Sequence, residues 1–325
     1  MGNGCTTSKN DEGVKATQNS VNSNNNINGV WSRNQYEVHK FINLKAHVFS
    51  IVSLNQNKIA TGTIDNSIRI WDIENCKLLN TLSGHPGSVL CLTLFSPNIL
   101  LSGSTKETIK VWDLSKLVCI KTLTSGEVFY INSIIKISDS YIASGSNDKD
   151  VKIWNMNDEN GKVIKTLSGH KFAIFSLLKL EYTPEYFIST SADYTMILWD
   201  TKNLVSKDSV TFRHDDRVNC LVELSLNTFI SGSDDKSIKV WNLQTKKCIS
   251  LLIGHNSHVT CLVKLSDNII ASGSRDTKII IWNVNAGAMI KQLSLHNKPL
   301  RNLVLITDNK LASYAFDLRL NIINV

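Results

Sequence analysis

Apolar and polar residues alternate along most of this chain in short runs, and these runs recur at a nearly constant interval. One run, 259–265, alternates with period two, and further apolar runs follow it at 269–271 and 279–282. Period-two alternation with many Val and Ile residues predicts strands, and the Gly, Ser, Asn and Asp residues between the runs predict turns. The pattern therefore predicts units of about four short antiparallel strands, with little helix.

A tryptophan followed by Asp or Asn marks the end of the third strand in six units, and isoleucine takes its place in a seventh. The markers are Trp71, Trp112, Trp154, Trp199, Trp241, Trp282 and Ile323. Successive markers lie 41, 42, 45, 42, 41 and 41 residues apart. Such a period indicates a repeat architecture. Because one four-stranded unit leaves both of its faces uncovered, we expect the seven units to stack radially.

The repeated unit resembles the WD-repeat β-propeller family over residues 36–325. That family carries a histidine, a serine or threonine, and an aspartate at set distances before the tryptophan. In the sixth unit these are His255, Ser272, Asp276 and Trp282. The resemblance implies an all-β, seven-bladed propeller in which these side chains form a structural chain of hydrogen bonds. Catalysis is not expected of them, because an active site needs one constellation beside a pocket rather than copies around a ring.

Several units depart from this register. Lys106 replaces the aspartate of the second unit, and Glu127 replaces the histidine of the third. Ile323 replaces the tryptophan of the seventh unit. The family histidine is matched by His47 in the first unit and by His170 in the fourth, which lie 24 and 29 rather than 27 residues before their tryptophans. The departures mark either soft spots or a specialised surface, and the sequence leaves both interpretations open.

The register also predicts how the ring closes and where its domain begins. The chain ends with the third strand of the last unit, and the segment 36–45 aligns with an outer strand. We therefore expect residues 36–45 to close the last blade within a domain of residues 36–325. Residues 1–35 form a separate arm with eight asparagines among its first thirty residues, and its composition predicts disorder.

The start of the arm fits a lipid attachment signal. Gly2 followed by Thr6 matches the N-myristoylation pattern, and Cys5 is well placed for S-palmitoylation. One myristoyl chain binds membranes only marginally, so stable anchoring needs a second signal, and the arm is not polybasic. The sequence predicts acylation at Gly2 and Cys5, and the alternative is an unmodified polar tail.

Composition narrows the classes of protein and partner. The chain has 42% hydrophobic residues, no run of eighteen apolar residues and no secretory signal, so we expect a cytoplasmic protein held at the cytosolic face of a membrane. Its net charge is +7, but Lys and Arg are spread through every unit, so nucleic acid is not an expected partner. The sequence contains no Cys-x-x-Cys pair of the kind that binds zinc. We expect no cofactor and no small-molecule substrate.

A propeller binds partners through its rims, and the resemblance implies contacts at three loop positions in each unit. These positions form two arcs. The basic arc contains Arg217, His258, Arg275 and Arg301, and the aromatic arc contains Tyr130, Phe175 and Phe316. In the first unit they give Ser50, Val52 and Ile64. Arginine and aromatic residues dominate interfaces, and arginine clusters bind acidic or phosphorylated segments. We expect a protein or peptide partner of that kind, and the alternative is that these side chains pack their own loops.

Together these features predict a non-enzymatic scaffold or adaptor tethered to a membrane. A substrate-recognition subunit of a ubiquitin ligase is one alternative, although no F-box-like segment precedes the ring. A G-protein-β-like signalling subunit is another, although residues 1–35 show no heptad pattern for an N-terminal coiled coil.

Overall fold

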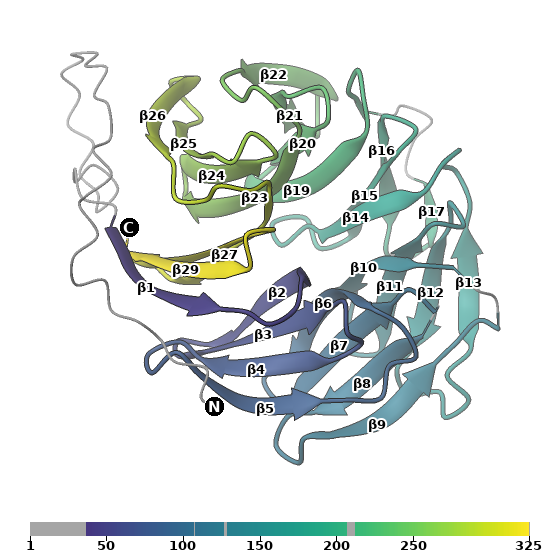
Figure 1. The fold of residues 1–325 in the computed structure, drawn as a ribbon. Coiled ribbons are helices and arrows are strands. Elements are labelled where there is room, and N and C mark those ends of the chain that lie inside the picture. The colour runs from purple at the N-terminus through teal and green to yellow at the C-terminus, as the bar shows by residue number, and fades with distance from the viewer. Residues whose placement is uncertain (1–36, 107, 127–128, 207–211, 325) are drawn as a thin grey trace.

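The computed structural model describes residues 37–106, 108–126, 129–206 and 212–324 (Figure 1). These residues form seven antiparallel sheets around a common centre, and no helix occurs among them. The all-β, seven-bladed propeller predicted from the sequence is confirmed. The predicted arm, residues 1–35, lies outside the described residues.

Each blade is a meander whose first strand lies nearest the centre of the ring. Blades 1 to 3 contain β2 (Val48–Asn55), β3 (Lys58–Thr63), β4 (Ile68–Asp72) and β5 (Lys77–Leu82); β6 (Val89–Ser96), β7 (Ile99–Ser104), β8 (Ile109–Asp113) and β9 (Val118–Leu123); and β10 (Ile131–Lys136), β11 (Tyr141–Ser146), β12 (Val151–Asn155) and β13 (Val163–Leu167). Strand order in these three sheets follows chain order.

Blades 4 to 6 follow the same plan. They contain β14 (Ile174–Lys179), β15 (Tyr186–Ser191), β16 (Thr195–Asp200), β17 (Val205–Ser206) and β18 (Phe212–Arg213); β19 (Val218–Ser225), β20 (Thr228–Ser233), β21 (Ile238–Asn242) and β22 (Lys247–Leu252); and β23 (Val259–Ser266), β24 (Ile269–Ser274), β25 (Ile279–Asn283) and β26 (Ala288–Leu293). In blade 4 the outer position is shared by two short strands, because β17 and β18 both pair with β16.

Blade 7 combines the two ends of the described chain. It contains β27 (Leu300–Thr307), β28 (Lys310–Ala315), β29 (Arg319–Asn324) and, as its outer strand, β1 (Glu37–Asn43). β1 pairs antiparallel with β29 in a register that runs from Glu37↔Asn324 to Asn43↔Arg319. The beginning of β1 therefore lies beside the end of β29, as Figure 1 shows. This pairing covers what would otherwise be an open edge of β29.

The hydrophobic core is divided into seven clusters, each between two neighbouring blades. Trp71, for example, is 1% exposed and packs with Tyr314 and Leu320 of blade 7. The blades approach closely where β20 carries Gly232, because a Cβ there would lie 2.6 Å from Cγ1 of Val259 in blade 6. Burying an aliphatic or aromatic side chain contributes about 1.5–3 kcal/mol, so the ring is held together mainly between its blades.

The repeated aspartate shapes the turn between the second and third strands. In blade 5, Asp235 Oδ1 accepts a hydrogen bond of 2.9 Å from the N–H of Ser237, which closes an Asx turn. Lys236 between them has a φ of 72°. Equivalent residues in five other blades also have positive φ, namely Asn66, Lys149, Tyr194, Thr277 and Leu318. The aspartate therefore stabilises a turn conformation that side chains otherwise disfavour.

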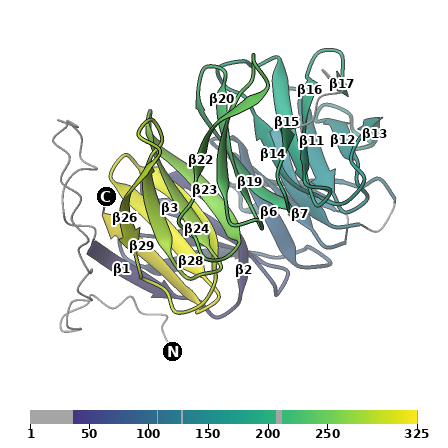
Figure 2. The same cartoon turned by 90° about the horizontal axis from the view of Figure 1, so that it is seen from above.

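The connections lie on two opposite faces of the ring. The loops between blades and the turns between second and third strands share one face, which we call the rim face. Antiparallel strands place the remaining turns on the other face. Seen from the side, β19, β20 and β22 run through the thickness of the ring between these faces (Figure 2).

Candidate functional site on the rim face

The conspicuous polar residues of each blade form a buried chain of hydrogen bonds. In blade 6, Trp282 Nε1–H donates to Ser272 Oγ at 2.7 Å, and this hydroxyl lies 2.7 Å from His255 Nε2. His255 Nδ1 is 2.8 Å from a carboxylate oxygen of Asp276. Burial alone would raise the pKa of Asp276, but the hydrogen bond and charge of His255 bring it below its ordinary value. All four groups satisfy one another inside the blade, so the geometry is that of a structural element.

The same chain recurs in neighbouring blades. Blades 4 and 5 have it complete, in His170, Ser189, Asp193 and Trp199 and in His214, Ser231, Asp235 and Trp241. In blade 7, where Ile323 replaces the tryptophan, Asn321 Nδ2 lies 3.2 Å from His296 Nε2 and 3.2 Å from the carbonyl oxygen of Leu295. A polar side chain of the third strand thus contacts the histidine of the blade that lacks the indole.

Two of the departures from the register have local substitutes. In blade 2, where Lys106 replaces the aspartate, His85 Nδ1 lies 3.2 Å from Thr108 Oγ1. In blade 3 the buried Asp148 pairs with the buried Lys152 at 2.5 Å, so a lysine of the third strand supplies the positive partner of this carboxylate. Glu127, which replaces the histidine, lies outside the described residues.

Blade 1 requires a correction, because His47 is not its structural histidine. The position 27 residues before Trp71 is occupied by Leu44, which is 6% exposed and packs in the core. Trp71 Nε1–H still donates to Thr61 Oγ1 at 3.0 Å. His47 instead lies on the rim face, with its ring 5.6 Å from that of Phe316. The sequence alignment of blade 1 had been set by residue type, because a histidine, His47, occurs three residues after Leu44. This choice shifted the predicted positions of blade 1 by three residues.

A backbone hydrogen bond joins the two outer rim positions of every blade. The N–H of the residue before the aspartate position donates to the carbonyl of the residue just before the first strand. The pairs, donor first, are Ile64–His47, Thr105–Ser88, Asn147–Tyr130, Ala192–Ala173, Asp234–Arg217, Arg275–His258 and Phe316–Pro299. This pattern confirms the equivalence of the rim positions in blades 2 to 7 and replaces Ser50 by His47 in blade 1. We call this surface the inner rim. It consists of these paired residues and of one further residue in each blade, the bulge residue near the start of the first strand.

Bulge residues of the first strands form the innermost circle of the inner rim. Each breaks the register with the second strand and lies one residue past its beginning: Phe49, Leu90, Asn132, Phe175, Asn219, Thr260 and Arg301. Phe49 was missed by the sequence interpretation because His47 was misaligned. Val52, which had been placed at this position, instead packs in the core between blades 1 and 2.

The first predicted arginine, Arg217, is occupied by contacts within the ring. Its Nε and Nη2 atoms contact one oxygen of Asp234 at 2.8 and 2.6 Å, and its guanidinium lies 4.9 Å from the centre of the Phe175 ring. Asn219 Nδ2 donates to the other oxygen of Asp234 at 2.7 Å, and His258 Nδ1 lies 3.0 Å from it. Arg217 and Phe175, assigned to separate arcs, are therefore stacked neighbours.

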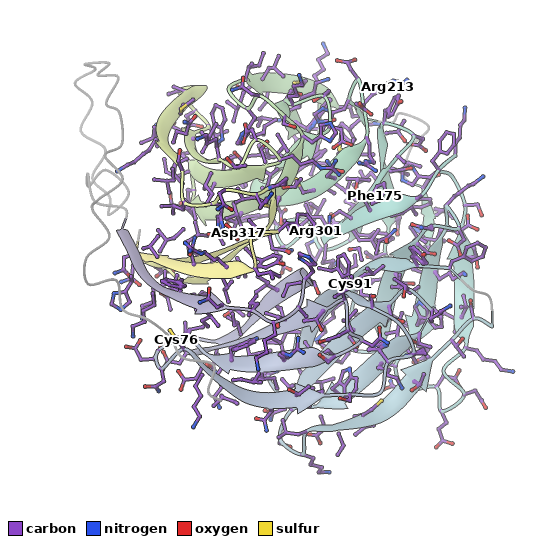
Figure 3. All side chains as sticks on the ribbon, in the orientation of Figure 1. Cys76, Cys91, Phe175, Arg213, Arg301 and Asp317 are labelled. Carbon is purple, nitrogen blue, oxygen red and sulfur yellow. The ribbon has the colours of Figure 1, made fainter. Side chains whose placement is uncertain are left out.

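Arg301 and Arg275 differ from Arg217 because they have no acidic partner. In the described ranges no carboxylate contacts either guanidinium, and Arg275 is exposed while Arg301 is partly buried. The Arg301 guanidinium lies 5.9 Å from the centre of the Phe49 ring, near the middle of the propeller (Figure 3). Burial and the nearby charges of Arg275 and Arg217 lower its pKa. The inner rim therefore carries three arginines, of which only Arg217 has a carboxylate partner among the described residues.

The predicted aromatic residues line other parts of the inner rim. Tyr130 is 47% exposed and Phe316 is 38% exposed. Phe172, two residues after the structural histidine of blade 4, is 58% exposed and was not among the predicted positions. Solvent-exposed aromatic rings next to arginines are typical of protein-binding surfaces.

The opposite face of the ring carries a recess without catalytic groups. Its volume is about 380 Å³, and it lies between blades 5 and 6, lined by residues that include Leu224, Val240, Ile249, Asn268 and Val284. The lining contains no His, Cys, Asp or Glu. Across the part of the chain that the structure describes, no cluster of three such residues is arranged to hold a metal ion.

The predicted lipid attachment residues, Gly2 and Cys5, lie outside the described residues. Among the residues that are described, no helix has the length and apolar character needed to cross a membrane.

Comparison with known proteins identifies the family. The chain belongs to the WD-repeat family, described as "WD domain, G-beta repeat", whose repeat matches it at residues 38–72, 76–113, 117–155, 161–200, 207–242 and 246–283. Propellers of this family are generally non-enzymatic scaffolds. The last blade, with its isoleucine marker, follows the final matched segment.

Similar proteins include several with WD repeats in larger chains. The chain is 24% identical over 210 residues to p21-activated protein kinase-interacting protein 1-like of Danio rerio. This match covers 63% of the present chain and 54% of the Danio rerio protein. The chain is 30% identical over 215 residues to F-box/WD repeat-containing protein 10 of Homo sapiens, covering 65% and 20%. It is 25% identical over 204 residues to Autophagy-related protein 16 of Arabidopsis thaliana, covering 63% and 31%. The matches thus span about half of these relatives or less.

Proposed function

We propose that this WD-repeat protein is a non-enzymatic adaptor whose inner rim binds an acidic or phosphorylated segment of a partner protein. The observation that carries this proposal is that three successive blades place Arg217, Arg275 and Arg301 on the inner rim, while among the described residues only Arg217 has a carboxylate partner, Asp234. A surplus of positive charge beside exposed aromatic rings attracts acidic segments and offers apolar contacts to their flanks.

The names of the relatives agree with a role in protein interaction. The Danio rerio protein is named for its interaction with a protein kinase, and the Homo sapiens protein is named for an F-box as well as WD repeats. The second name favours the alternative of a substrate-recognition subunit of a ubiquitin ligase, which also binds partner segments. Both functions place the partner on the propeller, so they differ in what else the chain assembles with.

Affinity capture with the full chain tests the adaptor function. A variant with Arg275→Glu and Arg301→Glu should lose the captured partners, while Arg213→Glu, a change at an exposed arginine outside the inner rim, should keep them. Arg217 is left unchanged because a glutamate there would face Asp234 and disturb the fold. Capture that persists in the folded double variant would contradict the proposal. Ubiquitin-ligase components among the partners would support the alternative.

We also propose that Gly2 and Cys5 carry acyl groups that hold the protein at the cytosolic face of a membrane. The pattern around Gly2 and the weakness of a single acyl chain support this proposal. The position of β1 is compatible with it. Glu37 pairs with Asn324, at the end of blade 7 opposite to the rim-face turn that contains Asp317. The described part of the chain therefore begins at the face opposite to the inner rim.

Cell fractionation tests the membrane proposal separately. Gly2→Ala should move the protein from membranes to the cytosol and abolish labelling with a myristate analogue. Cys5→Ser should keep that label but weaken membrane retention, because one chain remains. A wild-type protein found entirely in the cytosol without label would contradict the proposal, while leaving the role of the inner rim unaffected.

A further inference from the structure

One register position of the outer strands carries a lysine in most blades but a serine in blade 5. It lies opposite the residue that precedes the marker of the third strand, so that Ser250 pairs with Val240. Blade 4 has no described pair there, because two short strands share its outer position. In the other blades, from blade 1 to blade 7, the residues at this position are Asn80, Lys121, Lys165, Ser250, Lys291 and Lys40.

Three of these lysines connect their blade to the next one through a hydrogen bond from Nζ to a backbone carbonyl oxygen. The pairs, donor first, are Lys121–Met156 at 2.9 Å, Lys165–Asn203 at 3.4 Å and Lys40–Glu74 at 2.6 Å. Each acceptor belongs to the turn between the third and fourth strands of the next blade. Lys40 also contacts the carboxylate of Glu74, but in blades 3 and 4 the carbonyl oxygens are neutral acceptors. This turn therefore binds an ammonium group at three blade junctions.

The recess on the opposite face lies at the equivalent junction of blades 5 and 6, whose outer strands are β22 and β26 (Figure 1). Ser250 lines it together with the whole turn of blade 6, residues 284–287. Its hydroxyl oxygen faces this turn, since a Cβ on Gly287 would lie 3.7 Å from it. A serine oxygen is bonded directly to Cβ, whereas the ammonium of lysine stands at the end of a four-carbon stem. The recess of about 380 Å³ thus lies where a lysine side chain crosses between other blades.

The blade 6 turn retains the acceptor that a lysine uses elsewhere. Val284 is the equivalent of Met156, because each lies two residues after its marker tryptophan. The Val284 carbonyl accepts one hydrogen bond of 3.2 Å, from the N–H of Gly287. A carbonyl oxygen has two lone pairs, so it can accept an ammonium hydrogen as well.

The walls of the recess match the two parts of a lysine side chain. Leu224 and Val240 are among the apolar lining residues, and Asn268 is among the polar ones. Long cationic side chains lay their methylene stem along apolar surface and keep their charged end on polar groups. Leu226 and Ile249, beside and in the lining, are 58% and 57% exposed. These exposed aliphatic side chains offer apolar contacts to the backbone that carries such a lysine.

We propose that the recess between blades 5 and 6 binds a lysine side chain of a partner protein, which supplies in trans the ammonium group that other blades supply themselves. The ammonium donates to the Val284 carbonyl, as Lys121 does to that of Met156, and its stem lies along the apolar wall. This surface is on the face opposite to the inner rim, so it binds a segment different from the one proposed for the rim.

Methyl NMR of the full chain, labelled at Ile, Leu, Val and Met, tests the site with N-acetyl-lysine methylamide as the probe. The Ile249 and Val284 methyl signals should shift and saturate. N-acetyl-norleucine methylamide has the same stem without the ammonium and should bind about tenfold more weakly or worse. Ser250→Lys fills the recess from within the chain and should abolish the shifts, whereas Ser250→Thr keeps a short hydroxyl side chain and should retain them.

A gain of binding provides the reciprocal test. Lys121→Ser removes the lysine between blades 2 and 3 and should add saturable shifts at the methyl group of Met156. Equal affinity for the norleucine compound would overturn ammonium recognition, and shifts that persist in Ser250→Lys would show binding elsewhere. An absence of saturable shifts in the wild-type chain would also refute the site. Each of these outcomes leaves the role of the inner rim untouched, and thermal melting checks that every variant is folded.

Discussion

Removing the Ser272 hydroxyl should destabilise the propeller more than removing the equivalent hydroxyl in blade 7. Ser272 Oγ accepts from Trp282 Nε1–H and bonds His255 Nε2, both at 2.7 Å, and its side chain is fully buried. Ser272→Ala therefore leaves two polar groups without partners in an interior that water does not reach. Ser313 is the equivalent residue of blade 7, and it is also fully buried.

The magnitude follows from counting the groups left unsatisfied. Each orphaned donor or acceptor costs about 1–3 kcal/mol, so Ser272→Ala, which orphans two groups, should lower the free energy of unfolding by roughly 2–6 kcal/mol. In blade 7 no indole depends on Ser313, and His296 Nε2 keeps Asn321 Nδ2 at 3.2 Å. Ser313→Ala should then lose about one net hydrogen bond, near 1 kcal/mol.

Urea denaturation of the wild type and both variants measures the difference. The midpoint of unfolding, followed by tryptophan fluorescence and far-UV circular dichroism, should fall clearly further for Ser272→Ala than for Ser313→Ala. The two substitutions remove the same atom from equivalent buried positions, so each controls for cavity formation and strand propensity in the other. Equal shifts of the two midpoints would refute the explanation by orphaned polar groups.

Three further predictions concern pH, closure and a buried ion pair. Burial and the charge of Lys110 lower the pKa of His85 to about 4. As the pH falls from about 6.5 to 4, this histidine is therefore protonated in the unfolded chain but not in the folded one, which favours unfolding. Wild type should lose roughly 3 kcal/mol more stability over that interval than His85→Gln, and parallel profiles of melting temperature against pH would contradict this. Deleting residues 36–45 removes β1 and exposes the edge of β29, so the whole ring should melt earlier, and an unchanged melting temperature would argue against closure. Lys152→Met leaves the buried Asp148 without its cation and should cost roughly 3–5 kcal/mol, most of it recovered by adding Asp148→Leu, as denaturant midpoints would show.

Most of the scaffold could be predicted from the sequence because its determinants are local and repeated. Alternation, turn residues and the spacing of tryptophans define four strands per unit and seven units, whatever their neighbours are. The polar chain of blade 6 was also predictable, since Ser272 and Trp282 lie on neighbouring strands of one blade and His255 and Asp276 lie in the loop and turn of the same blade. The same reasoning failed at His47, where one histidine matched the family by type but not by spacing.

The chemistry of the inner rim depends on contacts between blades, which the sequence does not encode locally. Arg217 and Phe175 lie in different blades, yet the rotation between sheets stacks one on the other. Arg301 and Phe49 come from opposite ends of the chain and meet only because the ring closes. The sequence by itself thus determined the number and register of the blades through short-range periodicity. Only the tertiary structure decided which arginine is neutralised by Asp234 and which lack a carboxylate partner, because charge balance depends on neighbours brought together by closure of the ring.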